Sequence, residues 1–155
     1  VGVSVVNALS QWLEVTVWRE GKVHVQRFER GAPATSMQVE PGDAKRTGTS
    51  IQFLPDNTIF TTGIVFDYAT LAGRLRELAF LNGGVRIIFT DNRPEFFKND
   101  EPHVETYFYE GGIREYVTYM NREKQPLHEE IVYVQGERNN VHVEVALQWS
   151  ADAYN

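Results

Sequence analysis

The residues best suited to hold a charged ligand stand at the start of the chain. Gly2 is followed by Val3, Ser4 and an apolar segment with helical spacing that runs to Ser10. Backbone N–H groups in the first turn of a helix have no partner inside the helix, and the helix dipole favours an anion there. Glycine also lets a ligand approach the backbone closely. The pattern is typical of a phosphate-binding helix, but a buried helix that begins at a glycine fits the same residues and is more common.

The other side chains with chemical potential do not form a catalytic set. The four histidines have no metal-ligand spacing, and no order of Ser, His and Asp supports a catalytic triad. Glu129 and Glu130 are more consistent with a solvated edge than with an acid–base pair. We expect exposed or hydrogen-bonded imidazoles at His24, His103, His128 and His142.

The elements that must position the opening segment begin with a pair of strands. Apolar and polar residues alternate over 13–18, and residues 19–22 have the composition of a hairpin turn. The alternation returns over 23–28, and a further strand is predicted over 47–54. Between them, residues 31–46 contain two prolines and two glycines and are predicted to form a loop.

A helix is predicted to begin after Asp67, whose carboxylate can accept an N–H group from the first turn. It ends at Asn82–Gly84, where glycine supplies the left-handed cap. The spacing predicts a core-facing stripe formed by Leu71, Leu75, Leu78 and Ala79. The other face carries charge, and there we expect a modest pair between Arg74 and Glu77, with Arg76 beside it.

Beyond this helix the pattern alternates between strands and one more helix. Strands are predicted over 85–90 and 104–109, separated by a polar loop over 91–103. A second helix follows Gly111-Gly112, with one apolar face, and ends at Gln125-Pro126.

The last part of the chain has the clearest strand pattern. Residues 131–135 are predicted to form a strand, and after a turn at 136–140 residues 141–149 alternate between apolar and polar side chains. A two-stranded hairpin is only marginally stable alone, so this piece needs more sheet to pair with. Because composition also shifts before the hairpin, we expect one domain over residues 1–126 and the start of a second over residues 127–155.

Composition and charge limit the class of protein. The chain has 155 residues, of which 42% are hydrophobic and 23% charged, as in an ordinary globular domain. It contains no apolar run long enough to cross a bilayer. The absence of cysteine excludes disulfides and thiolate metal sites. A net charge of −6 argues against duplex DNA binding through the field of this chain itself.

A set of motifs recurs along nearly the whole chain. In order, they are Val1–Ser10 with Trp12–Val15, Thr47-Gly48-Thr49, Arg74–Asn82, Tyr109–Ile113 and Val143–Trp149. Together they resemble the ATPase subunits of type IIA topoisomerases, namely gyrase B and the B subunit of topoisomerase IV. The ATPase fold of that family is shared with the GHKL proteins, which include heat-shock chaperones, MutL and histidine kinases.

The resemblance implies a fold and a place within a longer subunit. The fold class would be α/β, an α+β two-layer sandwich with a mixed sheet and helices on one face. Residues 1–126 would form the C-terminal half of a GHKL-type ATPase domain, and residues 127–155 the first hairpin of a transducer domain. The parent subunit would couple ATP binding and hydrolysis to negative supercoiling of DNA, or to decatenation if it is topoisomerase IV. A non-catalytic structural fragment is the remaining alternative.

The resemblance also assigns nucleotide contacts. Backbone N–H groups would hold the ATP phosphates at Val1, Gly2, Val3 and Ser4. The adenine pocket would include Gly48, Thr49, which hydrogen-bonds the base, and Ile51, which packs against its ring. A pocket for adenine needs few polar groups in an apolar wall, although an ordinary strand explains these residues on pattern alone. Arg19 would lie at the pocket rim, where aminocoumarin inhibitors bind.

The groups that perform hydrolysis in the family have no counterpart in this chain. The glutamate that activates water, the Mg²⁺-binding asparagine, the adenine-reading aspartate and the glycine-rich lid precede this segment in the family's order, and a lysine for the γ-phosphate follows it. Hydrolysis needs a positioned base and a metal. We therefore expect ATP and Mg²⁺ to serve the parent subunit, no catalytic residue or metal ligand in this chain, and no hydrolysis by the chain alone.

The resemblance implies several partners. They are the remainder of the B subunit, the gyrase A subunit, a second B subunit that dimerises on ATP binding, and DNA contacted through other regions of the complex. The expected compartment is the bacterial cytoplasm, with no membrane partner.

Overall fold

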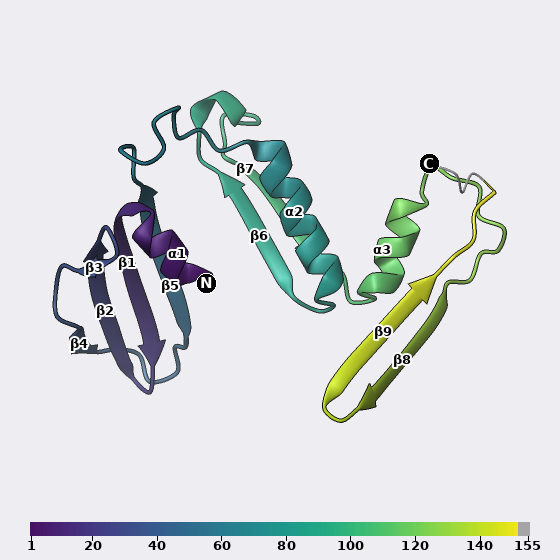
Figure 1. Cartoon of the computed structure of the whole chain (residues 1–155), viewed down its shortest axis with the longest axis horizontal. Helices are drawn as coiled ribbons and strands as arrows, with labels where there is room; N and C mark the ends of the chain where they lie inside the picture. Colours follow the sequence, from purple (N-terminus) through teal and green to yellow (C-terminus); the bar gives the residue numbers. More distant parts are fainter. Residues whose placement is uncertain (152–155) are drawn as a thin grey trace. The chain divides into compact units, whose positions relative to one another are not determined.

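The computed structural model of the chain describes residues 1–151, which form two compact units that divide after Val65 (Figure 1). Strands and helices both contribute to each unit, so the expected α/β class is confirmed. The division into units differs from the domain boundary expected at residue 126, which stays a prediction. No helix in the described part of the chain is both long enough and apolar enough to cross a bilayer.

The first unit is built on an antiparallel sheet with β1 near its centre. β1 (Ser10–Arg19) pairs with β2 (Lys22–Glu29) on one side and with β5 (Gly48–Pro55) on the other, which confirms the expected hairpin and third strand. The β1–β2 turn consists of Glu20 and Gly21, both with positive φ, at 53° and 71°. Such a turn matches the right-handed twist of the strands. β5 is the last strand on its side of the sheet.

The segment between β2 and β5 is more regular than the predicted loop. It contains β3 (Ala32–Pro33) and β4 (Gln38–Pro41), and both pair with β2. Proline has no N–H to donate and is tolerated on edge strands, so it does not exclude these short pairings. Strands this short give no periodic signal, which is why the sequence predicted only a loop.

The opening helix, α1 (Val3–Ala8), is short and has no buried residue. Within this chain the helix is thus not buried, and the phosphate-binding role stays a prediction. β1 begins at Ser10 rather than at residue 13, and its register with β5 shifts between Ser10 and Trp12. A β-bulge breaks the period of two, so the start of the strand has no alternating pattern.

In the second unit, α2 (Tyr68–Leu81) contacts a two-stranded sheet made of β6 (Arg86–Asp91) and β7 (His103–Phe108). The carboxylate of Asp67 accepts the N–H of Thr70 at 2.7 Å, so the expected N-cap is confirmed. Hydrogen bonds from the side chain and the backbone N–H of Thr70 lower the pKa of Asp67 from its usual value.

The core of the second unit includes part of the predicted stripe, because Ala79 is buried in it and Leu75 packs against it. Ala72, Ala79 and Phe80 are buried, and Tyr107 of β7 joins the same cluster. Leu71 is 36% exposed, so its assignment to the core was wrong. Leu71 and Leu78 are seven residues apart, and so are Ala72 and Ala79. The spacing alone therefore did not show whether Leu71 or Ala72 is buried.

Arg76 also lies differently from its predicted place on a solvated face. Its guanidinium carbon lies 5.2 Å from the ring centroid of Tyr107, and its Nη1 donates to the Tyr119 hydroxyl at 3.1 Å. The predicted ion pair between Arg74 and Glu77 is confirmed on the exposed side.

α3 (Ile113–Met120) starts at Gly112, whose φ is 56°, and ends before the predicted stop at Gln125-Pro126. A Cβ atom on Gly83 would lie 3.2 Å from the Cα atom of Gly112. The loop after α2 and the loop before α3 thus touch backbone to backbone. Gly84 has the positive φ, at 85°, that was predicted for a glycine after α2.

The terminal hairpin is confirmed with different bounds. β8 (Val132–Arg138) and β9 (Val141–Leu147) are joined by Asn139 and Asn140, with φ of 53° and 62°. Asparagine tolerates this left-handed conformation, so two residues suffice for the turn. Gly136, predicted in the turn, pairs within β8, and Trp149 lies beyond the end of β9.

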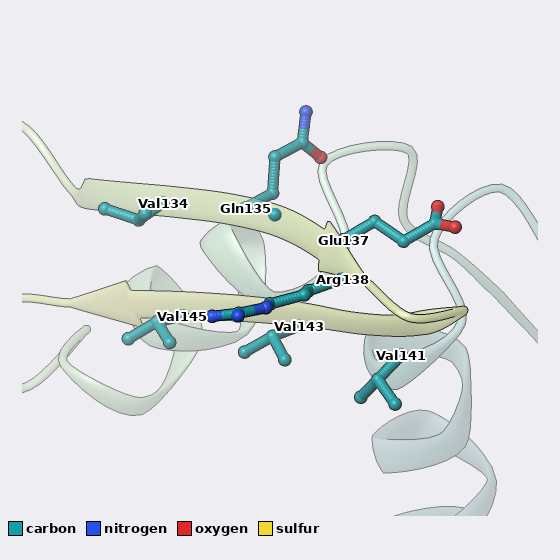
Figure 2. Close-up of a pocket in the computed structure, with 8 residues that line it drawn as sticks. Val134, Gln135, Glu137, Arg138, Val141, Val143 and Val145 are labelled. Carbon is teal, nitrogen blue, oxygen red and sulfur yellow. The ribbon is translucent and has the colours of Figure 1, made fainter.

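One side of this hairpin is an apolar surface that the described residues leave exposed. Figure 2 shows Val141, Val143 and Val145 pointing to the same side of β9. The other side is polar and faces α3, where the guanidinium carbon of Arg114 lies 4.0 Å from the ring centroid of Tyr133. We call the apolar surface the valine face; it consists of Val132, Val134, Val141, Val143 and Val145, exposed by 44, 61, 60, 53 and 41%.

The strands pair in three separate sheets rather than in the single mixed sheet that was expected, and every pairing in the described residues is antiparallel. The largest sheet lies in the first unit, while β6–β7 and β8–β9 are two-stranded. The predicted loop over residues 91–103 includes a short 3₁₀ turn, Pro94–Phe96.

Asp91 ends β6 as a buried carboxylate that a single arginine holds. It is 6% exposed, and Arg93 approaches it with Nε at 2.9 Å from Oδ1 and Nη2 at 2.6 Å from Oδ2. Nη1 of the same arginine donates to the carbonyl of Phe66 at 2.7 Å. Hydrogen bonds from Arg93 lower the pKa of Asp91, although desolvation opposes them.

Phe80 is 2% exposed and stacks on Tyr109 with ring centroids 3.6 Å apart. Phe80→Ala should lower the free energy of unfolding by about 3–5 kcal/mol, because it removes buried apolar surface and leaves a cavity. Urea unfolding followed by tyrosine and tryptophan fluorescence measures this change. Phe97→Ala is the matched control, since Phe97 is 38% exposed, and it should have a much smaller effect. Equal effects of the two substitutions would contradict this description of the core.

Asp91 should make stability depend on pH in the acid range. Its pKa is lower in the folded chain than the ordinary value of 3.8, so the folded state binds fewer protons there than the unfolded state. The stabilisation from Asp91 is fully present at pH values above the ordinary pKa of 3.8, and it is lost as the pH falls through the lowered pKa of the folded state. Urea midpoints measured between about pH 5 and pH 2 should fall less steeply for Asp91→Asn than for the wild type. Parallel curves would show that this carboxylate does not contribute.

Candidate functional site

The predicted phosphate-binding residues form the open first turn of α1. Gly2 caps the helix with φ 86° and ψ −129°, a conformation that favours glycine. Its carbonyl accepts the N–H groups of Val5 and Val6 at 3.0 and 3.3 Å. The N–H groups of Gly2, Val3 and Ser4 come before these first helical bonds and lie at the helix entrance. No acidic residue stands in the first turn, so an approaching anion meets no like charge from α1.

The register of the sheet brings the other predicted residues together. Val17 pairs with Thr49 and Val15 pairs with Ile51. Opposed residues of antiparallel strands point to the same face, and so do alternate residues along one strand. Arg19 therefore shares a face with Thr49 and Ile51. We call this surface the β1–β5 face; it consists of Val15, Val17, Arg19, Thr49 and Ile51.

Gly48 contributes through its backbone. It pairs with Trp18, and its φ is 146°, a conformation that other residues rarely adopt. A Cβ atom at this position would have nothing within 4 Å. The backbone conformation, and not crowding, therefore explains glycine at the start of β5.

The β1–β5 face has the mixed character that a pocket for a flat heterocycle needs. Ile51 is 45% exposed and offers apolar surface beside the hydroxyl group of Thr49. A groove bordered by Val15, Val17 and Met37 adjoins it. Ligand pockets are largely apolar with a small number of polar groups that fix orientation.

Arg19 is held only weakly by its neighbours. Its Nε lies 3.2 Å from Oε1 of Glu20, and the two side chains are 75% and 78% exposed. Exposed ion pairs contribute little to stability, so this guanidinium is free to turn toward a ligand.

α1 is tied to its unit at its C-terminal end. Ser10 Oγ donates to the carbonyl of Val6 at 2.6 Å, and the N–H of Asp56 donates to the carbonyl of Leu9 at 2.9 Å. At the other end, Val1 is fully exposed. The structure thus brings Arg19, Gly48, Thr49 and Ile51 together on β1 and β5, while Val1, Gly2, Val3 and Ser4 form a separate group on α1, which contacts β1.

Asp56, which was not identified from the sequence, directly follows β5 and is 1% exposed. Its Oδ1 accepts the N–H of Thr58 at 2.9 Å and the Thr58 hydroxyl at 2.7 Å, and its Oδ2 accepts Nε of Arg30 at 2.9 Å. The hydrogen bonds from Thr58, and then that from Arg30, lower the pKa of Asp56 against the effect of desolvation. An aspartate two residues before a threonine is a known turn signal and could have identified this group.

A second polar cluster lies between α2 and β7. The Tyr68 hydroxyl is 3.2 Å from Nε2 of His103, which is 3.4 Å from Oε1 of Glu105. Tyr107 donates its hydroxyl to the other oxygen of Glu105. Burial, reinforced by the hydrogen bond to Glu105, raises the pKa of Tyr107 well above its usual value. The Tyr107 hydroxyl is therefore held as a donor to Glu105.

Three of the histidines are exposed or hydrogen-bonded as expected, whereas His24 is half-buried and lines a groove with Val15 and Val17. His103 is hydrogen-bonded, with 12% of its side chain exposed. Nε2 of His128 accepts the N–H of Trp149 at 3.1 Å, and Nε2 of His142 lies 3.7 Å from a carboxylate oxygen of Glu144. Across residues 1–151 no three carboxylate or imidazole side chains are arranged to hold a metal ion.

Comparison with known proteins relates the chain to one family. The family model for DNA gyrase B matches residues 112–155. The chain is 60% identical to the DNA gyrase B protein of Synechocystis over 155 residues, which are 100% of this chain and 14% of that protein. It is 55% identical to the DNA gyrase B protein of Halalkalibacterium halodurans over 150 residues, which are 97% of this chain and 22% of that protein. The chain thus spans less than a quarter of these curated relatives.

A solved structure extends the comparison to the fold. The crystal structure of the 43K ATPase domain of Thermus thermophilus gyrase B, in complex with an aminocoumarin, superposes with a TM-score of 0.81 and 33% identity, covering 96% of this chain and 39% of that one. These relatives are all named as gyrase B, and none favours the topoisomerase IV alternative. The chain belongs to the DNA gyrase B family and corresponds to one segment of its longer members.

Proposed function

We propose that this chain is the ATP-binding segment of a gyrase B protein, which couples ATP binding and hydrolysis to negative supercoiling of DNA. The observation that carries the proposal is the match to the Thermus thermophilus gyrase B ATPase domain over 96% of the chain. The open turn of α1 and the β1–β5 face support it, because ATP combines an anionic tail with a flat heteroaromatic base.

The first turn of α1 would hold the phosphates. Backbone N–H groups at a helix entrance donate to phosphate oxygens without the desolvation penalty of a buried cation, and Gly2 lets the ligand approach closely. The exposure of Val3, 52%, leaves room for this approach. The residues assigned to this role are Val1, Gly2, Val3 and Ser4.

The β1–β5 face would receive the adenine. The hydroxyl group of Thr49 would hydrogen-bond the base, and Ile51 would pack against its ring. The unusual φ of Gly48 sets the start of β5. Arg19, which is weakly paired, would lie at the rim and contact an aminocoumarin inhibitor, so the parent protein would be an aminocoumarin target.

Mg²⁺ would be held elsewhere in the parent protein. The described residues contain no cluster of three carboxylate or imidazole groups that fits the ion. Mg²⁺ prefers several oxygen ligands in near-octahedral geometry. We therefore assign no metal ligand and no catalytic base to this chain, and no step of hydrolysis is derived from its residues.

Other parts of the enzyme would supply the remaining functions. Residues 1–126 would belong to the ATPase domain, and residues 127–155 would begin the transducer domain. The exposed valine face supports this division, because the terminal hairpin needs more structure to cover it. We propose the gyrase A protein and a second gyrase B protein as partners in the cytoplasm. DNA would contact other regions, in keeping with the net charge of −6 on this chain.

Thr49 offers a direct test of the adenine site. Thr49→Val in the full-length protein keeps the shape and the strand preference but removes the hydroxyl group. Affinity for a non-hydrolysable ATP analogue, measured by calorimetry, should fall about tenfold, as expected for one lost hydrogen bond. Thr49→Ser keeps the hydroxyl group and should bind nearly as the wild type does. Wild-type affinity of the valine variant would exclude this role for Thr49.

The isolated chain should not hydrolyse ATP, because neither a positioned base nor a metal site is assigned to it. Release of inorganic phosphate from ATP and Mg²⁺ should stay at the level of buffer alone, while the full-length protein turns over. Turnover that coelutes with the chain in size-exclusion chromatography, and that changes with Thr49→Val, would overturn this expectation.

A further inference from the structure

α1 needs an anchor outside itself. It has only six residues, and none of them is buried. Isolated helices of this length are unstable in water, since nucleation is unfavourable and few hydrogen bonds follow. The direction of the helix is therefore set by the contacts at its C-terminal end.

Two of these contacts come from loops that are far apart in the sequence. The N–H of Asp56, after β5, donates to the carbonyl of Leu9 at 2.9 Å. Gly31, after β2, lies under the helix, where a Cβ atom would stand 3.2 Å from the Cα atom of Ala8. One loop thus holds the last turn of α1 by a hydrogen bond, and the other supports it by close backbone contact.

An ion pair joins the two loops. Arg30 directly precedes Gly31, and its Nε donates to Oδ2 of Asp56 at 2.9 Å. Its own N–H donates to the carbonyl of Gln11 at 3.4 Å, which fixes the loop to β1. The Asp56 side chain is 1% exposed, and its other oxygen is saturated by Thr58. The position of Asp56 therefore depends on groups in two segments.

We propose that the Arg30–Asp56 ion pair is a clamp that sets the direction of α1 and so positions its first-turn N–H groups for the nucleotide phosphates. The proposal rests on the proposed function, since it assigns that role to α1. Arg30 and Asp56 are positioning residues and do not touch the nucleotide. The Arg30 side chain is 60% exposed and its contacts converge on the loops that hold α1, so we expect its replacement to act locally on α1.

Arg30→Gln in the full-length protein tests the clamp. The substitution removes the cation but retains a polar side chain, and Arg30 is 60% exposed, so the fold should persist. Hydrogen exchange of peptides from residues 1–9 should become about five- to tenfold faster, as expected when a hydrogen bond to a charged group is lost. Arg30→Lys should restore much of the protection. Lys45→Gln, which removes one positive charge from an exposed loop of the same unit, should leave exchange unchanged.

Ligand affinities show whether the ion pair positions the first turn of α1 for phosphate or only stiffens the whole unit. For Arg30→Gln, affinity for a non-hydrolysable ATP analogue should fall about tenfold, whereas affinity for adenosine, which has no phosphates, should stay within about twofold. Unchanged exchange over residues 1–9 would overturn the clamp. Faster exchange with unchanged affinity for the analogue, or with equal losses for both ligands, would overturn its positioning role.

A wild-type measurement distinguishes this failure from failure of the proposed function. The ATP analogue should slow exchange over residues 1–9 in the unmodified protein, because phosphate contacts protect the first turn. If the analogue slows exchange over residues 1–9 in the wild type, and Arg30→Gln binds the analogue with unchanged affinity, the clamp is rejected but the phosphate-binding role of α1 is kept. No protection in the wild type would reject the phosphate-binding role of α1.

Discussion

The first unit depends on a single strand, β1, whose backbone is hydrogen-bonded to β2 along one edge and to β5 along the other. α1 enters directly at one end of this strand, and Arg19 stands at the other. Because both neighbours are antiparallel and in fixed register, the face on which Thr49 and Ile51 lie is determined by their partners Val17 and Val15. A slip of one residue would turn these side chains to the opposite face.

In the second unit, close backbone packing plays a comparable part. The approach of Gly83 to Gly112 leaves no room for side chains between the end of α2 and the start of α3. The stack of Phe80 on Tyr109 and Tyr116 continues this contact through the aromatic rings. α3 in turn contacts β9, so the terminal hairpin is connected through α3 to the helix that covers β6 and β7.

Much of this arrangement follows from short-range sequence signals. The hairpin around Gly21, the cap at Asp67 and the turn before Val141 are local features, and periodicity with turn chemistry predicts them. The inward place of Arg76 and the burial of Asp56 depend on partners distant in the chain, and no local pattern reports such contacts. The nucleotide contacts come from family resemblance, since Thr49 and Ile51 on their own are ordinary strand residues.

The outer position of β5 has a consequence for handling the chain in solution. Among the described residues, no strand pairs with the outer edge of this eight-residue strand, and its Ile51, Phe53 and Leu54 side chains are 45, 43 and 41% exposed. Such an edge is a template for another strand, including β5 of a second molecule. Any purified piece of the protein whose sheet ends at β5 will therefore aggregate more as its concentration rises. A charged residue or a proline introduced on that edge should keep it monomeric.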